Sequence, residues 1–136
     1  DMAIIGNIGD SRAYHITPEG IFQISRDHSV VENMVAKGDL TPLEARTHPN
    51  RNLITRALGP DIHAKADAFE LPWHKDEFLL LCSDGLVNTV SDQEMLFEVL
   101  HDGDVNECLD HLLQISLQRG APDNITAVLL LNEEGR

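Results

Sequence analysis

Several features that would place a protein in a specialised class are scarce in this chain of 136 residues. Aromatic residues make up only 4%, and two cysteines, Cys82 and Cys108, are too few for a disulfide framework or a cysteine-rich zinc site. No apolar run approaches the roughly 20 residues of a membrane-spanning helix. We therefore expect no membrane span, a reduced cytoplasmic setting, and a core position rather than a nucleophilic role for Cys82.

Positive charge is also scarce, with 10 Lys and Arg against 23 Asp and Glu and a net charge of −13. Nucleic acids and anionic membranes attract basic surfaces, so neither is expected as a partner. The remaining composition is that of an ordinary globular domain, 42% hydrophobic and 24% charged. The sequence does not begin with Met and enters an apolar pattern at once, which favours a piece of a longer protein.

Turn and capping signals divide the chain into strands and helices. A strand over 2–8, the turn Gly9-Asp10-Ser11 and a strand over 12–16 predict a β-hairpin. Further strands are expected over 21–24, 53–58, 66–70, 77–82 and 124–131. Capping patterns predict helices that follow Ser29, Thr41, Ser91 and Asp104. Because strands come in runs and helices in runs, we expect an α+β fold with antiparallel sheet.

Three aspartates lie at strand ends, each close to a Gly or Pro that bends the chain: Asp10, Asp84 and Asp123. Asp is common in turns because its side chain bonds nearby backbone N–H groups, and this alone explains any one of them. Together they also suit a hard cation, since Mg²⁺ and Mn²⁺ prefer oxygen ligands. The residues by themselves leave both interpretations open.

The sequence around these aspartates resembles the type 2C (PPM) metal-dependent serine/threonine protein phosphatases, in particular the bacterial ones. Six short motifs carry the resemblance, in this order: Gly9-Asp10-Ser11-Arg12, Asp27-His28, His48-Pro49-Asn50-Arg51-Asn52, Thr55-Arg56-Ala57-Leu58-Gly59, Leu80-Leu81-Cys82-Ser83-Asp84-Gly85-Leu86 and Asp123-Asn124-Ile125-Thr126. A lone Ser-Asp-Gly is common, but six motifs in one order over nearly the whole chain are specific.

The resemblance implies a β-sandwich of two antiparallel sheets flanked by helices, of which the N-terminal strands and helices are missing here. Residues 1–136 would be the C-terminal part of one catalytic domain, with a flap subdomain at about 31–59. By this likeness, Asp84 and Asp123 would be ligands of a two-metal Mn²⁺ or Mg²⁺ centre, and Asp10 with Asp84 would hold a third, weaker metal. Asn88 stands where some relatives have a further Asp, which would weaken that third site.

The implied reaction is hydrolysis of phosphoserine and phosphothreonine in proteins by a water that bridges two metals. The partners would be phosphorylated proteins, and the enzyme would oppose a Ser/Thr kinase. The family's phosphate-gripping Arg and general-acid His belong to the missing part, so we expect no catalytic residue in this chain and no activity of the chain alone. Open sheet edges favour self-association. The alternatives are a non-catalytic, pseudophosphatase-like module that binds partners and a purely structural fragment.

The predicted flap is locally basic inside an acidic chain. Residues 37–56 include four basic residues and only two acidic ones. A solvated surface explains this pattern. The functional alternative is that Arg46 and Arg51 attract phosphorylated substrates.

Overall fold

The chain folds into an α+β sandwich whose larger sheet is covered by helices on one face. The computed structural model describes residues 1–60, 62–121 and 124–133. Its elements are β1 (Met2–Asn7), β2 (Arg12–Thr17), β3 (Gly20–Gln23), α1 (Val30–Ala36), α2 (Pro42–Thr47), β4 (Asp67–Pro72), β5 (Phe78–Cys82), α3 (Asp84–Val87), α4 (Asp92–His101), α5 (Val105–Gln118) and β6 (Ala127–Leu131). None of the described helices is long and apolar enough to cross a membrane.

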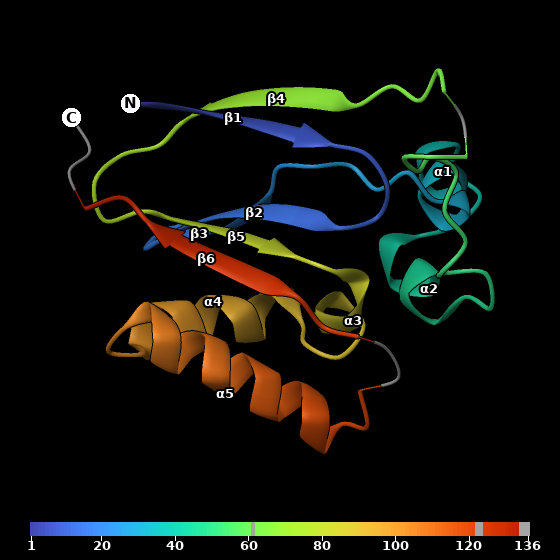
Figure 1. Ribbon diagram of the computed structural model, residues 1–136. Helices are drawn as coiled ribbons and strands as arrows, with labels where there is room; N and C mark the ends of the chain where they lie inside the picture. The colour runs from blue at the N-terminus through green and yellow to red at the C-terminus, as the bar shows by residue number, and fades with distance from the viewer. Residues whose placement is uncertain (61, 122–123, 134–136) are drawn as a thin grey trace.

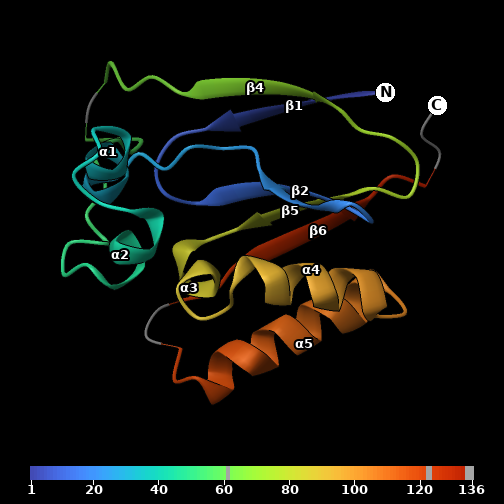
Figure 2. The same ribbon diagram turned by 180° about the vertical axis from the view of Figure 1, so that it is seen from behind.

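Two antiparallel sheets form the sandwich. β1 pairs with β4 in a two-stranded sheet, and the four-stranded sheet has the order β3-β2-β5-β6. Figure 1 and the reverse view in Figure 2 show the sheets as separate layers, with α4 and α5 on the outer face of the larger sheet. The helices α1 and α2 lie beside the strand ends in both views. The fold class predicted from the sequence is confirmed.

The main core lies between the four-stranded sheet and the helices. Tyr14 of β2, Met95 of α4 and Leu112 of α5 are almost completely buried there. Each large apolar side chain buried in this way contributes about 1.5–3 kcal/mol, so this layer dominates the stability. Cys82 is also buried in this core, as predicted, and burial raises the pKa of its thiol to about 12. A smaller cluster lies between the two sheets and consists of Ala3, Leu71 and Leu79.

The predicted hairpin between the first two strands is wrong. β1 and β2 follow each other in the chain but belong to different sheets, since β1 pairs with β4 and β2 pairs with β3 and β5. Gly9, with a φ of +107°, turns the chain from one sheet to the other. A turn signal marks where the chain bends. It does not determine whether the flanking strands pair or enter two layers of a sandwich.

The strand predicted over 53–58 is also absent from these described residues. The segment makes a single bridge, between Ser29 and Ile54. The N–H of Thr55 donates to the carbonyl of His28 at 2.8 Å, so the segment runs beside the residues that precede α1. Its apolar side chains Leu53, Ile54 and Leu58 are exposed and do not mark a strand of either sheet.

The predicted helix starts are confirmed by hydrogen bonds. Four cap side chains each accept from the backbone N–H three residues later, and they are Ser29, Thr41, Ser91 and Asp104. At Thr41 and Ser91 the glutamate three residues on completes a reciprocal capping box. The helix α3 has no counterpart among the predicted elements, because four residues are too few to show a helical period.

Candidate active site

Asp10 and Asp84 lie together at one end of the four-stranded sheet, although they are far apart in the sequence. Asp10 lies in the turn that leads into β2, and Asp84 begins α3 directly after β5. β2 and β5 are antiparallel, with Arg12 opposite Cys82, so the residues just outside this pair meet at the same edge. The two carboxyl groups interact, since the negative charge of Asp84 contributes to a raised pKa of Asp10.

Crowding of these carboxyl groups changes the acidity of Asp10. Its pKa is raised to about 6, first by burial and then by the negative charges of Asp84 and Asp27 and the hydrogen bond with Asp84. Carboxylates so close together resist ionisation unless a cation joins them. Among the residues that the structure describes, neither Asp10 nor Asp84 is paired with a basic side chain. The pair therefore fits the oxygen ligands that Mg²⁺ and Mn²⁺ prefer.

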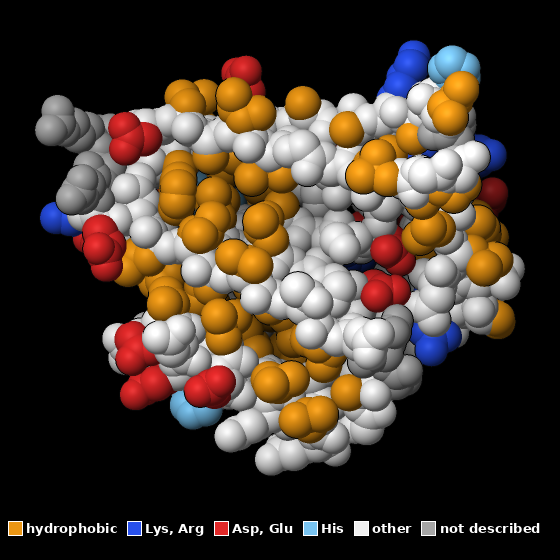
Figure 3. All heavy atoms as spheres, viewed as in Figure 1, with side chains coloured by type: hydrophobic (Ala, Val, Ile, Leu, Met, Phe, Trp, Pro, Cys, Tyr) orange, Lys and Arg blue, Asp and Glu red, His pale blue; other side chains and the backbone are white. Residues whose placement is uncertain are grey.

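A cavity of about 520 Å³ adjoins the two aspartates, between the sheet end and the helices α1 and α2. Arg12 and Asp27 also line it, and Arg46 and Arg51 reach it from the predicted flap. Figure 3 shows acidic side chains beside a hollow at this end of the molecule, with basic side chains nearby. Carboxylates and guanidinium groups on one cavity suit a cation together with a phosphate group.

Arg12 is committed to a hydrogen-bonded network at the back of the cavity. Its Nε donates to Asp27 at 3.0 Å, its Nη2 donates to the same carboxylate at 2.9 Å, and its Nη1 donates to the hydroxyl of Tyr14 at 3.0 Å. Tyr14 in turn donates to Asp92 at 3.2 Å. This network pairs Asp27 with Arg12 and orders one wall of the cavity, so Arg12 acts as a structural residue here.

Asp123 lies outside the described residues, so its predicted place beside Asp84 stays a prediction. Its neighbour Asn124 is described, and the backbone carbonyl of Asn124 packs directly on Gly85, where a Cβ would collide with it. The chain next to Asp123 is therefore held against the residue next to Asp84.

The predicted flap touches α3 through two side chains. Nη2 of Arg46 donates to the carbonyl of Val87 at 3.1 Å, and Nδ2 of Asn88 lies 3.3 Å from Oδ1 of Asn52. Arg51, in contrast, bonds only a carbonyl of its own segment among the described contacts. Of the two arginines predicted to attract substrate, Arg46 is thus also a link between the flap and the helix that carries Asp84.

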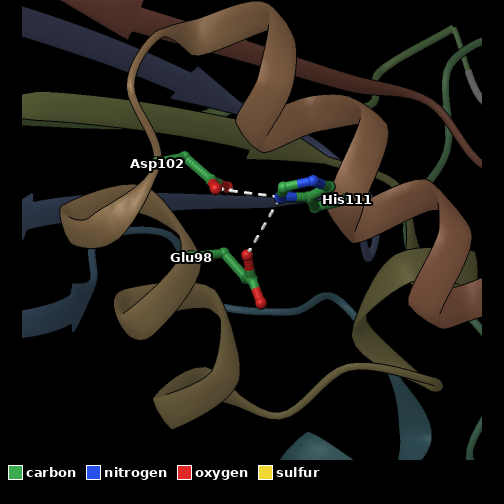
Figure 4. A group of neighbouring side chains, drawn as sticks. All are labelled: Glu98, Asp102 and His111. Atoms are coloured by element: carbon green, nitrogen blue, oxygen red, sulfur yellow. Dashed lines mark hydrogen bonds and ion pairs between the residues drawn. The ribbon is translucent and has the colours of Figure 1, made fainter.

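A second cluster of acidic and histidine side chains lies elsewhere, where α4 connects to α5 (Figure 4). Nδ1 of His111 is 2.8 Å from Oδ1 of Asp102 and 3.5 Å from Oε2 of Glu98. The hydrogen bond to Asp102 is the main cause of a raised pKa of His111. Figure 1 places this connection at the opposite end of the helix layer from α3, so the cluster is separate from the aspartate pair. The ion pairs of His111 with the two carboxylates account for this cluster. The sequence analysis missed the cluster, although Glu98 and Asp102 are one helical turn apart.

The α+β sandwich is the fold of the bacterial serine/threonine phosphatases whose solved structures the chain matches. No family model matches the chain. It is 35% identical over 138 residues to the serine/threonine phosphatase stp of Listeria monocytogenes, across 99% of this chain and 55% of that protein. The chain is a relative of the bacterial type 2C (PPM) serine/threonine phosphatases, as the motifs predict, and spans about half the length of the curated relatives it matches.

Solved structures agree with this relationship. The serine/threonine phosphatase Stp1 from Staphylococcus aureus matches with a TM-score of 0.90 and 40% identity, over 98% of this chain and 52% of that one. The catalytic domain of the phosphatase PstP, solved in complex with two manganese ions, matches with a TM-score of 0.78 and 31% identity, over 95% of this chain and 53% of that one.

Proposed function

We propose that this chain is part of a protein phosphatase that hydrolyses phosphoserine and phosphothreonine in proteins with the help of divalent cations, Mn²⁺ or Mg²⁺. The observation that carries the proposal is the crowded pair of Asp10 and Asp84, in which the pKa of Asp10 is raised to about 6 beside a cavity that arginines also line. The names of its relatives, and the two manganese ions in one related structure, support the same chemistry.

In this proposal the aspartates of the chain divide the cation binding among them. Asp84 and Asp123 hold the two-metal centre, and Asp10 together with Asp84 holds a third, weaker cation. The packing of Asn124 on Gly85 supports a place for Asp123 near Asp84. Asn88 binds a hard cation less tightly than a carboxylate would, which weakens the third site. Bound cations supply hydroxide near neutral pH by lowering the pKa of water.

The flap, at about 31–59, serves substrate binding in this proposal. Arg51 lines the cavity and is exposed, so it attracts the phosphorylated segment of a substrate. Arg46 contributes less directly, because its guanidinium is bonded to Val87. The phosphate-gripping Arg and the general-acid His belong to the part of the domain that this chain does not contain, so the chain alone is inactive. A cytoplasmic location and an opposing Ser/Thr kinase stay predictions.

The test joins residues 1–136 to the segment of the Listeria phosphatase that the chain does not match. We expect the chimera to dephosphorylate a phosphothreonine peptide with Mn²⁺, and Asp84→Asn to lower kcat by about 100-fold or more. Asp110→Asn, an exposed carboxylate on α5, is the matched control and leaves the rate unchanged. Full activity of Asp84→Asn would overturn the proposal. A folded chimera that binds no Mn²⁺ would favour the non-catalytic binding module instead.

A further inference from the structure

His28 lies beneath the turn that carries Asp10 and joins it to the other sheet. The ring is only 6% exposed. The backbone N–H of His28 donates to the carbonyl of Gly9 at 2.8 Å, and its ring Nδ1 accepts from the N–H of Gly9 at 3.0 Å. On the other side, Nε2 lies 2.7 Å from Oδ2 of Asp67, the first residue of β4, and Oδ1 of Asp67 is 3.2 Å from Nη1 of Arg56.

These contacts determine which ring nitrogen carries the proton. The N–H of Gly9 can only donate, so Nδ1 of His28 presents its lone pair to it. Nε2 therefore carries the hydrogen and donates it to Asp67. The pKa of Asp67 is lowered, chiefly by this hydrogen bond, as expected of a carboxylate that accepts from the ring.

The backbone N–H and the carbonyl of Gly9 both form hydrogen bonds with His28. Gly9 is buried and has a φ of +107°, a conformation that few other residues adopt. A buried N–H without a partner is unfavourable, so loss of the Nδ1 acceptor would let the turn reorient toward water. Asp10 is the next residue, and its carboxyl group would move with the turn.

We infer that His28 is a positioning residue: through Gly9 it sets where the carboxyl group of Asp10 stands relative to Asp84, while Asp67 holds the ring from the opposite side. The ring touches neither cation nor substrate and acts only through the backbone of the turn. Where it concerns cation binding, the inference rests on the proposed function. The proposed cation site lies at the end of the four-stranded sheet. Its affinity would thus depend on Asp67, which begins β4 in the two-stranded sheet.

Two conservative substitutions separate the two ring contacts. The side-chain oxygen of Asn can take the place of Nδ1, so His28→Asn keeps an acceptor for Gly9. The longer amide of Gln reaches the place of Nε2, so His28→Gln keeps the bond to Asp67. Both remove the ring and are expected to destabilise the fold to a similar extent, so a purely structural role of His28 would affect both variants alike.

Calorimetric titration of the whole chain with Mn²⁺ measures the effect. We expect the dissociation constant to rise about 10-fold or more in His28→Gln and less than about 3-fold in His28→Asn. Equal affinity in the two variants and the wild type would overturn the inference. So would equal loss in both, because the contact with Gly9 would then not be the one that matters.

Two NMR measurements do not depend on the cation. In the wild type, ¹⁵N shifts are expected to show the proton of His28 on Nε2, and the amide of Gly9 is expected to exchange slowly. The Gly9 amide stays protected in His28→Asn and exchanges rapidly in His28→Gln. A proton on Nδ1 in the wild type would overturn the inference even if a variant failed to fold. Absence of Mn²⁺ binding by the wild type, with this pattern intact, would refute the proposed cation site and leave the positioning of the turn standing.

Discussion

Arg46 of α2 donates a hydrogen bond to the carbonyl of Val87 at 3.1 Å and so fastens the flap to the short helix that begins with Asp84. Arg46 therefore links two segments, whereas substrate attraction is proposed for Arg51. Arg51 keeps its guanidinium near the cavity and makes its described hydrogen bond only within the flap.

The two arginines are therefore expected to differ in their kinetic effects in the chimeric phosphatase. Arg51→Ala should raise the KM for a phosphopeptide several-fold at low ionic strength and much less at high ionic strength, because salt screens exposed charges. Arg46→Ala should change kcat as well, with little salt dependence, since it releases the flap from α3. Lys37→Ala removes an exposed flap charge that does not line the cavity and serves as control. An unchanged KM of Arg51→Ala at low salt would count against substrate attraction.

Replacing Gly85 tests the close packing next to Asp84. A Cβ at this position would collide with the carbonyl of Asn124, so Gly85→Ala is expected to lower the free energy of unfolding by about 1–3 kcal/mol. Gly6→Ala is the matched control, because no atom lies within 4 Å of its added Cβ. Urea denaturation of both variants gives the comparison, and equal stability of the two would contradict the close contact between Gly85 and Asn124.

The ion pair between Glu94 and Arg119 predicts an acid-dependent contribution to stability. The hydrogen bond from Arg119 is the main cause that lowers the pKa of Glu94 from 4.5 to about 2. The folded carboxyl group binds protons less readily than the unfolded one, so its stabilisation is complete above about pH 4.5 and is lost as the pH falls toward 2. The Arg119 side chain is 48% exposed, so water and salt screen the pair and we expect its contribution to stability to be small. The stability difference between wild type and Glu94→Gln should shrink across this pH range; a constant difference would refute the assignment.

Exposed apolar strands predict that the chain associates with itself. Ile4 of β1 is 71% exposed and Leu130 of β6 is 41% exposed, both on strands at sheet edges. Light scattering should show dimers or larger species at high concentration, reduced in the double variant Ile4→Lys and Leu130→Lys. Leu43→Lys, which replaces a 77% exposed residue on α2, should not reduce association. A wild-type chain that stays monomeric would show this prediction wrong.

Local signals in the sequence predicted local structure well. Side-chain caps such as Thr41 and Ser91 mark helix starts because one hydroxyl and one backbone N–H decide them. The resemblance of the motifs around Asp10 and Asp84 implied a shared metal site. The register of β2 and β5 places the two residues at the same end of the sheet, and metal binding there stays a prediction.

Non-local relationships were beyond the sequence. Nothing near Gly9 indicates that β1 pairs with the distant β4, because strand pairing depends on which faces are buried in the finished sandwich. The role of His28 was missed for the same reason, since its partner Asp67 follows a long irregular segment. The Asp27-His28 motif, a few residues after β3, was the signal that could have led to it.

The two-stranded sheet of β1 and β4 affects how long Asp10 and Asp84 stay close to each other. β1 and β4 are held to the rest by a small cluster that includes Leu71, whereas the opposite face rests on the large helical core. Elements with little apolar contact open first in local unfolding. β1 leads into the turn that carries Asp10. β4 begins at Asp67, which accepts a hydrogen bond from the ring of His28. Fluctuations of β1 and β4 would therefore determine how long Asp10 and Asp84 keep their relative positions.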